Sequence, residues 1–216
     1  MKYDIIFSFD PGLTGGISIF EGKKLPIVYG MPLKKIIKNR KNKNICNLEE
    51  IANILRSHSS PKKKVLGVIE KQSARHKEGV VSSFTNGLGF GGLQGICYGL
   101  NFNVFIVPPA TWKKYYPNIV TENSIKLKEI QRGIWYKLKN TKEKHLKKQY
   151  KKEADKIKRQ IKADAKLQAR LIAQGLYPKL KEEFNRVKDD GKAESLLIGK
   201  YVKDNFKKIG VKNGLV

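Results

Sequence analysis

The sequence predicts an α/β fold in which a five-stranded mixed sheet is flanked by helices and carries a basic helical arm. Two patterns support this prediction. Short alternating or β-branched apolar runs are interspersed with helical periodicity, and a late stretch is long, helical and strongly basic. Because 216 residues suffice for one well-filled domain, we expect a single domain over 1–216 with a helical insertion at about 118–162.

The first strand is expected over residues 4–10, where apolar residues alternate and the run ends in Asp10. After a turn, residues 17–22 and 26–32 predict two further strands of an antiparallel meander. Residues 34–43 contain six basic residues and no acid, so we expect a loop or a frayed helix end there.

A helix capped by Asn47 is expected next, followed by a buried strand over 65–70 that ends in Glu70. Residues 81–100 predict a helix whose glycines, spaced four apart, let another backbone approach closely. Residues 102–107 predict the fifth strand. Three strands of an antiparallel meander therefore come first in the chain, and two further strands follow.

A short helix is expected over 111–115 and a last helix over 192–206. Between them, residues 137–170 contain 14 Lys or Arg and four Asp or Glu, which supplies +10 of the net charge of +26. A thin apolar stripe predicts that this stretch is a long helix or a helical hairpin projecting from the body. The stripe consists of Leu146, Tyr150, Ala154, Ile157 and Ile161.

The charge balance indicates a polyanionic partner. Lys and Arg number 45 against 19 Asp and Glu, and the pI is about 10.0. This excess is typical of proteins that bind nucleic-acid phosphates, although a solvated surface in a lysine-rich composition is the alternative.

We expect no membrane-spanning segment, no export signal and no zinc site. Residues 80–112 carry no charge, but Asn, Gln and Pro interrupt them, so we expect buried helix and strand, with Phe84 in the core. No export signal is visible at the start. Cys46 and Cys97 are far apart and form no CxxC motif, which fits a reducing compartment and predicts a cytoplasmic protein.

Four acids fall where the pattern predicts burial: Asp10 and Glu70 end strands, and Asp190 and Glu194 lie four apart at a helix start. A buried carboxylate costs several kcal/mol or stays protonated, and a divalent cation offsets that cost. The alternatives are a turn role for the first acid, capping for the third and a favourable helix-dipole position for the fourth. Asp189 competes with its neighbour as the third ligand.

These acids, in this order, resemble the RuvC family of Holliday junction resolvases, closest to its phage and chloroplast branches. The resemblance implies a ribonuclease H-like fold. The first two motifs and the last carry the acids, and the others are the glycine-containing helix and two lysine segments. In chain order, the matching segments are 9–21, 68–72, 82–95, 108–114, 165–169 and 188–201.

The resemblance implies that two Mg²⁺ or Mn²⁺ ions are bound per active site by Asp10, Glu70, Asp190 and Glu194. It further implies hydrolysis that leaves 5′-phosphate and 3′-hydroxyl ends, with Lys113 and Lys166 stabilising negative charge or anchoring the scissile phosphate. The alternative for both lysines is that they are ordinary surface residues.

By the same resemblance the substrate is branched DNA, the four-way junction, and the protein is a homodimer of bacterial, phage or viral origin, with an organelle not excluded. The DNA-contacting candidates are Arg75, His76, Lys77 and Lys114. The 52 residues between the two lysines of the site exceed what the family explains, so the arm either follows a junction duplex, packs on the partner, or does both. We expect its removal to weaken DNA affinity.

Three other functions remain open. A related nuclease acting on other branched DNA has the same motifs. An ATPase of the actin and sugar-kinase type has a phosphate loop resembling residues 10–16, but it needs two lobes, for which this chain is too short. A non-cleaving DNA-binding protein of this fold is expected to lose an acid, and all four are present.

Overall fold

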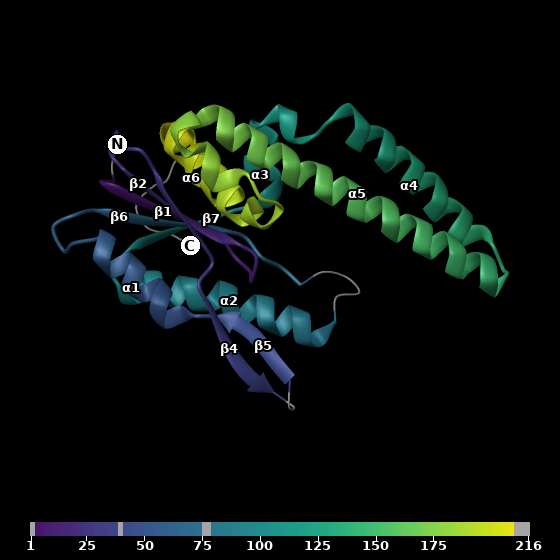
Figure 1. The fold of residues 1–216 in the computed structure, drawn as a ribbon, viewed down its shortest axis with the longest axis horizontal. Helices are drawn as coiled ribbons and strands as arrows, with labels where there is room; N and C mark the ends of the chain where they lie inside the picture. Colours follow the sequence, from purple (N-terminus) through teal and green to yellow (C-terminus); the bar gives the residue numbers. More distant parts are fainter. Residues whose placement is uncertain (1–2, 39–40, 75–78, 210–216) are drawn as a thin grey trace.

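A computed structural model describes residues 3–38, 41–74 and 79–209, and it contains the predicted five-stranded mixed sheet (Figure 1). Among the first three strands, each is antiparallel to its neighbour, and the last two run parallel to β1. In spatial order the strands are β3 (Ile27–Gly30), β2 (Gly16–Glu21), β1 (Ile5–Asp10), β6 (Val65–Glu70) and β7 (Asn103–Val107).

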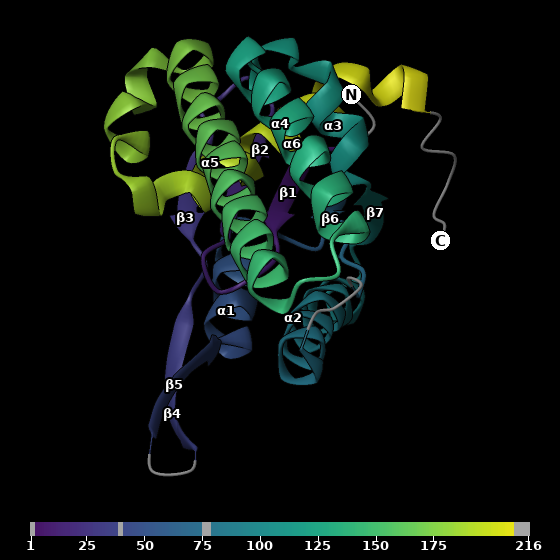
Figure 2. The ribbon, with the colours of Figure 1, turned by 90° about the vertical axis from the view of Figure 1, so that its right-hand side faces the viewer.

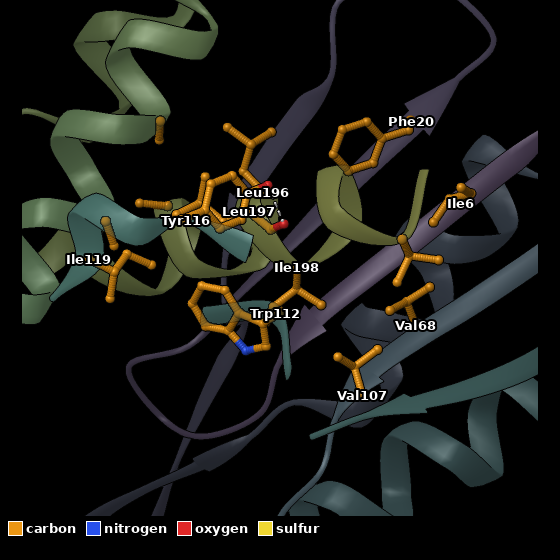
Figure 3. Packing of buried hydrophobic residues seen from close by; sticks show 14 of the residues in the cluster. Ile6, Phe20, Val68, Val107, Trp112, Tyr116, Ile119, Leu196, Leu197 and Ile198 are labelled. Atoms are coloured by element: carbon orange, nitrogen blue, oxygen red, sulfur yellow. Dashed lines mark hydrogen bonds between the residues drawn. The ribbon is translucent and has the colours of Figure 1, made fainter. Parts of the chain in front are cut away.

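Helices cover both faces of this sheet, which confirms the predicted α/β class. The helices α1 (Leu48–His58) and α2 (Val80–Gly99) lie on one face, and α3 (Pro109–Tyr115) and α6 (Asp190–Ile209) lie on the other. Because side chains alternate along a strand, each strand feeds both cores. Figure 3 shows the core under α6, where Ile6, Val68, Trp112 and Leu197 are among the packed residues.

Residues 34–43 were expected to be a loop or a frayed helix end, and this prediction is wrong. Residues 34–38 and 41–43 belong to a separate two-stranded ribbon of β4 (Leu33–Lys38) and β5 (Lys41–Cys46), which extends away from the body (Figure 2). The ladder forms because backbone groups pair whatever the charge of the exposed side chains. Ile36 and Ile45 instead line an apolar cleft against α2.

The basic stretch, residues 137–170, runs from the end of α4 (Glu122–Asn140) through most of α5 (Lys144–Leu176). These two long helices pack against each other as the α4–α5 hairpin (Figures 1 and 2). Their shared core consists of Ile134, Ala154 and Ile157, with Leu127, Tyr150 and Ile161 packed around them. Short 3₁₀ segments complete the chain at Pro117–Ile119, Pro178–Phe184 and Val187–Asp189. The domain and insertion boundaries stay predictions.

Helix α2 is less buried than its uncharged sequence predicts. Phe84 was expected in the core but is 71% exposed, because α2 packs on the sheet through Leu93 and Cys97 near its other end. A Cβ added at Gly91 or Gly95 would meet no described heavy atom within 4 Å, so this glycine face is open within the described chain. No helix in the described ranges is long and apolar enough to cross a membrane.

Candidate active site

Asp10 and Glu70 end neighbouring parallel strands. The last registered pair of β1 and β6 is Phe9 with Ile69, so the two acids follow at the same edge of the sheet. By alternation both side chains face the α6 side, since Phe9 and Ile69 belong to the core on the opposite face. The position of these two carboxylates therefore follows directly from strand register.

The start of α6 is held against the β1–β2 turn by unusually close backbone contact. A Cβ added at Gly16 would lie 2.5 Å from the carbonyl oxygen of Gly191, and one added at Gly191 would overlap the backbone of Thr14 and Gly15. A side chain at either glycine would force these segments apart. The backbone contact thus brings the α6 acids to the end of β1.

Three buried serines fix α6 on the sheet. The Oγ of Ser8 donates to the carbonyl oxygen of Ser195 at 2.7 Å, and the Oγ atoms of Ser18 and Ser195 are also 2.7 Å apart. Buried hydroxyls contribute most when they are paired in this way. Because Ser195 follows Glu194, these bonds set the position of that carboxylate relative to β1.

Helix α3 contributes a donor and a cation. The indole Nε1 of buried Trp112 donates to Oε1 of Glu70 at 2.8 Å, and Gln72 donates to the other carboxylate oxygen at 3.2 Å. The Nζ atom of Lys113 lies 3.5 Å from Oε1 of Glu194. Lys113 therefore lies beside one of the predicted acids, while Trp112 and Gln72 are contacts that the sequence analysis missed.

Two of these carboxyl groups, Asp10 and Glu70, have a raised pKa. Burial raises the pKa of Asp10 well above its ordinary value, and the charges of Glu194 and Glu70 raise it further, whereas Lys113 and Lys166 lower it. Burial also raises the pKa of Glu70, against the Trp112 hydrogen bond and the Lys113 charge. The structure thus brings together three of the four predicted acids and both predicted lysines.

Asp190 has a different environment. Its Oδ2 lies 3.2 Å from Nζ of Lys166, and its Oδ1 forms an ion pair with Arg170, one turn further along α5. The neighbouring Asp189 is bound instead by Arg186, at 3.0 Å from both Nε and Nη2. The contact with a predicted site lysine favours Asp190 over Asp189 as the third acid.

Arg170 is a site residue that sequence reasoning missed. It is 8% exposed and holds a carboxylate that is 4% exposed. Its signal was available, because an arginine four residues after Lys166 shares a helix face with it. The number of lysines and arginines in this stretch concealed it.

Asp10, Glu70 and Glu194 carry carboxylate oxygens, the ligand type that a hard divalent cation prefers. In the described part of the chain, no three His, Cys, Asp or Glu side chains are grouped as ligands of one ion. Asp10, Glu70 and Glu194 are nevertheless partly buried carboxylates, and the charges of Glu194 and Glu70 raise the pKa of Asp10, a repulsion that Mg²⁺ or Mn²⁺ would offset. Asp190 fits less well, because Lys166 and Arg170 already neutralise it.

The remaining predicted site residues lie at the margin. Lys114 is exposed on α3. Arg75, His76 and Lys77 fall outside the described residues, so their proposed contact with DNA stays a prediction.

No family model matches the chain, and no curated protein matches it in sequence. Among solved structures, Thermus thermophilus RuvC in complex with a Holliday junction substrate matches with a TM-score of 0.47 and 10% identity, over 98% of this chain and 99% of that chain. A second Thermus thermophilus RuvC structure matches with a TM-score of 0.46 and 12% identity, over the same shares of the two chains.

Proposed function

We propose that this chain is a structure-specific endonuclease of ribonuclease H-like fold that resolves four-way DNA junctions by metal-dependent phosphodiester hydrolysis. The observation that carries the proposal is the convergence of Asp10, Glu70 and Glu194, from two strands and a helix, into one partly buried group with raised pKa at Asp10. The matching order of motifs and the net charge of +26 support it.

Asp10, Glu70 and Glu194 would hold Mg²⁺ or Mn²⁺, with two ions per site as the resemblance implies. When bound, ions of this kind would supply activation of an attacking water and stabilisation of the leaving oxygen, and the resemblance implies 5′-phosphate and 3′-hydroxyl ends. Trp112 orients Glu70 through its indole N–H. We assign Asp190, the third of the four predicted acids, first to holding Lys166 and Arg170 beside the site.

Lys113 and Lys166 are suited to contact the scissile phosphate. Each Nζ faces a site carboxylate, and each side chain is more than a third exposed, so a phosphate oxygen can reach it. A lysine in this position stabilises the negative charge that develops during phosphoryl transfer. Lys114, which follows Lys113 on α3, would contact the flanking DNA backbone.

A homodimer is the proposed assembly, because paired cuts in a nearly two-fold symmetric junction need two sites. The first half of α2 supplies an apolar surface for a second copy: Val80, Phe84 and Leu88 are 85%, 71% and 58% exposed. Gly91 and Gly95 continue the same helix face and leave room for a close helix approach. Phe84→Glu is expected to give a monomer in size-exclusion chromatography with light scattering, and an unchanged dimer would exclude this interface.

A non-cleaving DNA-binding protein is the second candidate, favoured by the ion pair between Asp190 and Arg170. A related nuclease acting on other branched DNA would share the site. For either nuclease we propose the cytoplasm of a bacterium, or a phage-encoded or virus-encoded enzyme, with an organelle as the alternative.

The decisive experiment compares cleavage of a four-way junction and of linear duplex with the same sequence, in Mg²⁺. Asp10→Asn is expected to lose at least about 10³-fold in cleavage rate, because removing one ligand forfeits several kcal/mol of transition-state stabilisation. Asp4→Asn is the matched control, since this exposed acid lies just before the other end of β1. It should cleave like the wild type.

The outcomes separate the candidates. Equal cutting of duplex and junction would refute the resolvase assignment and leave a nuclease. Junction binding without any cleavage would favour the non-cleaving protein.

A further inference from the structure

One side of α5 carries a continuous row of basic residues that ends at the candidate site. Successive members are three or four residues apart, so they share one helix face. We call this row the basic stripe, and it consists of Lys148, Lys152, Lys156, Arg159, Lys162 and Lys166. The next position in the same spacing is Arg170, which is bound to Asp190.

The basic stripe faces away from the hairpin core. Ala154 and Ile157 are buried against α4, on the opposite side of α5 from the stripe. Lys148, Lys152 and Arg159 are exposed. The packing of the hairpin therefore holds the stripe outward along a rigid helix, with its charges at fixed spacing.

The stripe reaches the candidate site along a single helix, α5. Towards its C-terminal end, α5 packs into the core under α6 through Ala169 and Ala173. There Lys166 places its Nζ 3.2 Å from Asp190. At 1.5 Å per residue, Lys148 and Lys166 are about 27 Å apart along the helix, which corresponds to about eight phosphate steps of one strand.

We propose that the basic stripe binds the phosphate backbone of one duplex arm of a DNA substrate and directs that arm towards the candidate site. The inference rests on the proposed function and adds to it the surface that holds the DNA outside the site. The occupant is DNA and not a second copy of this chain. With 45 basic and 19 acidic residues, a second copy offers too few acids to match the stripe, and two such surfaces repel.

The test is a salt titration of DNA binding in the Asp10→Asn background, which prevents cleavage. The stripe variant carries Lys148→Gln, Lys152→Gln, Lys156→Gln and Arg159→Gln, which keep helix propensity. The control variant carries Lys23→Gln, Lys62→Gln, Lys207→Gln and Lys208→Gln, four exposed positions with the same change in net charge.

The stripe variant is expected to flatten the plot of log K against log salt by about 0.9 for each lost phosphate contact, up to about 3.6 in total. At low salt its affinity for the four-way junction should fall by about 10-fold to 10³-fold. The control variant should change the slope by less than a third of the change expected for the stripe variant.

Equal losses in both variants would show that net charge alone drives binding, and would overturn the stripe. An unchanged slope in the stripe variant would also overturn it. The pair Lys152→Gln and Arg159→Gln is the milder variant should the fourfold change unfold the protein, as judged by circular dichroism, and half the slope change is expected.

The two proposals fail separately. If the wild type cleaves junctions but the stripe variant binds like the control, the stripe is wrong and the nuclease stands. If the wild type does not cleave, a weaker salt dependence in the stripe variant still supports the stripe.

Discussion

At the edge of the sheet, three carboxylates are held close together and partly buried, whereas along α5 a row of lysines and arginines extends into solvent. The carboxylates depend on close backbone contact, where Gly16 meets Gly191, and on three serines that join α6 to the sheet. The basic stripe depends on helix periodicity and a small core. The site should therefore be sensitive to single changes in packing, whereas the stripe should be sensitive only to changes in charge.

The largest effect is expected from adding one methyl group at the contact between α6 and the β1–β2 turn. Gly191→Ala places a Cβ against backbone atoms of Thr14 and Gly15. Backbone atoms cannot move aside as the end of a flexible side chain can. We expect a loss of about 3 kcal/mol in the free energy of unfolding, together with loss of cleavage. Urea denaturation measures the first.

The hairpin supplies the matched control. A Cβ at Gly133, inside α4, meets no described heavy atom within 4 Å. Gly133→Ala should therefore stabilise the protein by about 0.5–1 kcal/mol through helix propensity. If both changes destabilise the protein equally, the contrast between the two regions is wrong.

Strand register made part of this site predictable. Asp10 and Glu70 were identified because each ends a buried run, and the pairing of β1 with β6 then places them side by side. The i, i+4 spacing likewise placed Asp190 and Glu194 on one helix face. What the sequence could not supply is the partner of each acid, because that depends on how α3 and α5 dock.

The second effect tests the ion pair between α5 and α6. Arg170→Met keeps the volume of the side chain but leaves the buried carboxylate of Asp190 with Lys166 as its cation. We expect a loss of about 2 kcal/mol in the free energy of unfolding, less than for a fully unpaired charge. The double variant with Asp190→Asn should recover most of it, and additive losses in the double-mutant cycle would contradict the pairing.

Charge misled the sequence analysis in two opposite ways. The basic residues of 34–43 obscured the β4–β5 ribbon, because they interrupt the apolar pattern that would predict a strand. The lack of charge around Phe84 predicted burial, yet this residue is exposed. Both errors arise because side-chain polarity alone does not predict whether backbone groups pair in a ladder, or whether an apolar side chain stays on the surface of the chain.

The smallest effect concerns pH. In protein without divalent ions, the folded-state pKa of Asp10 is raised above the unfolded value near 3.8, so the unfolded state ionises first. Stability from this group is present below about pH 4 and is lost as the pH rises through the folded pKa. Asp10→Asn should therefore be more stable than the wild type at pH 7, by on the order of 1 kcal/mol.

Thermal unfolding from about pH 4 to pH 7 measures this difference. A difference that does not change with pH would contradict the raised pKa. Glu49→Asn, at an exposed position on α1, serves as the control.

Mn²⁺ binding, followed by electron paramagnetic resonance, tests the central claim most directly. The account predicts that the wild type binds Mn²⁺ and that Asp10→Asn and Glu194→Gln each weaken this binding by about 10-fold or more, while Asp4→Asn does not. Equal Mn²⁺ affinity in all four proteins, or no binding by the wild type, would contradict a metal site built from these strand-end and helix-start acids.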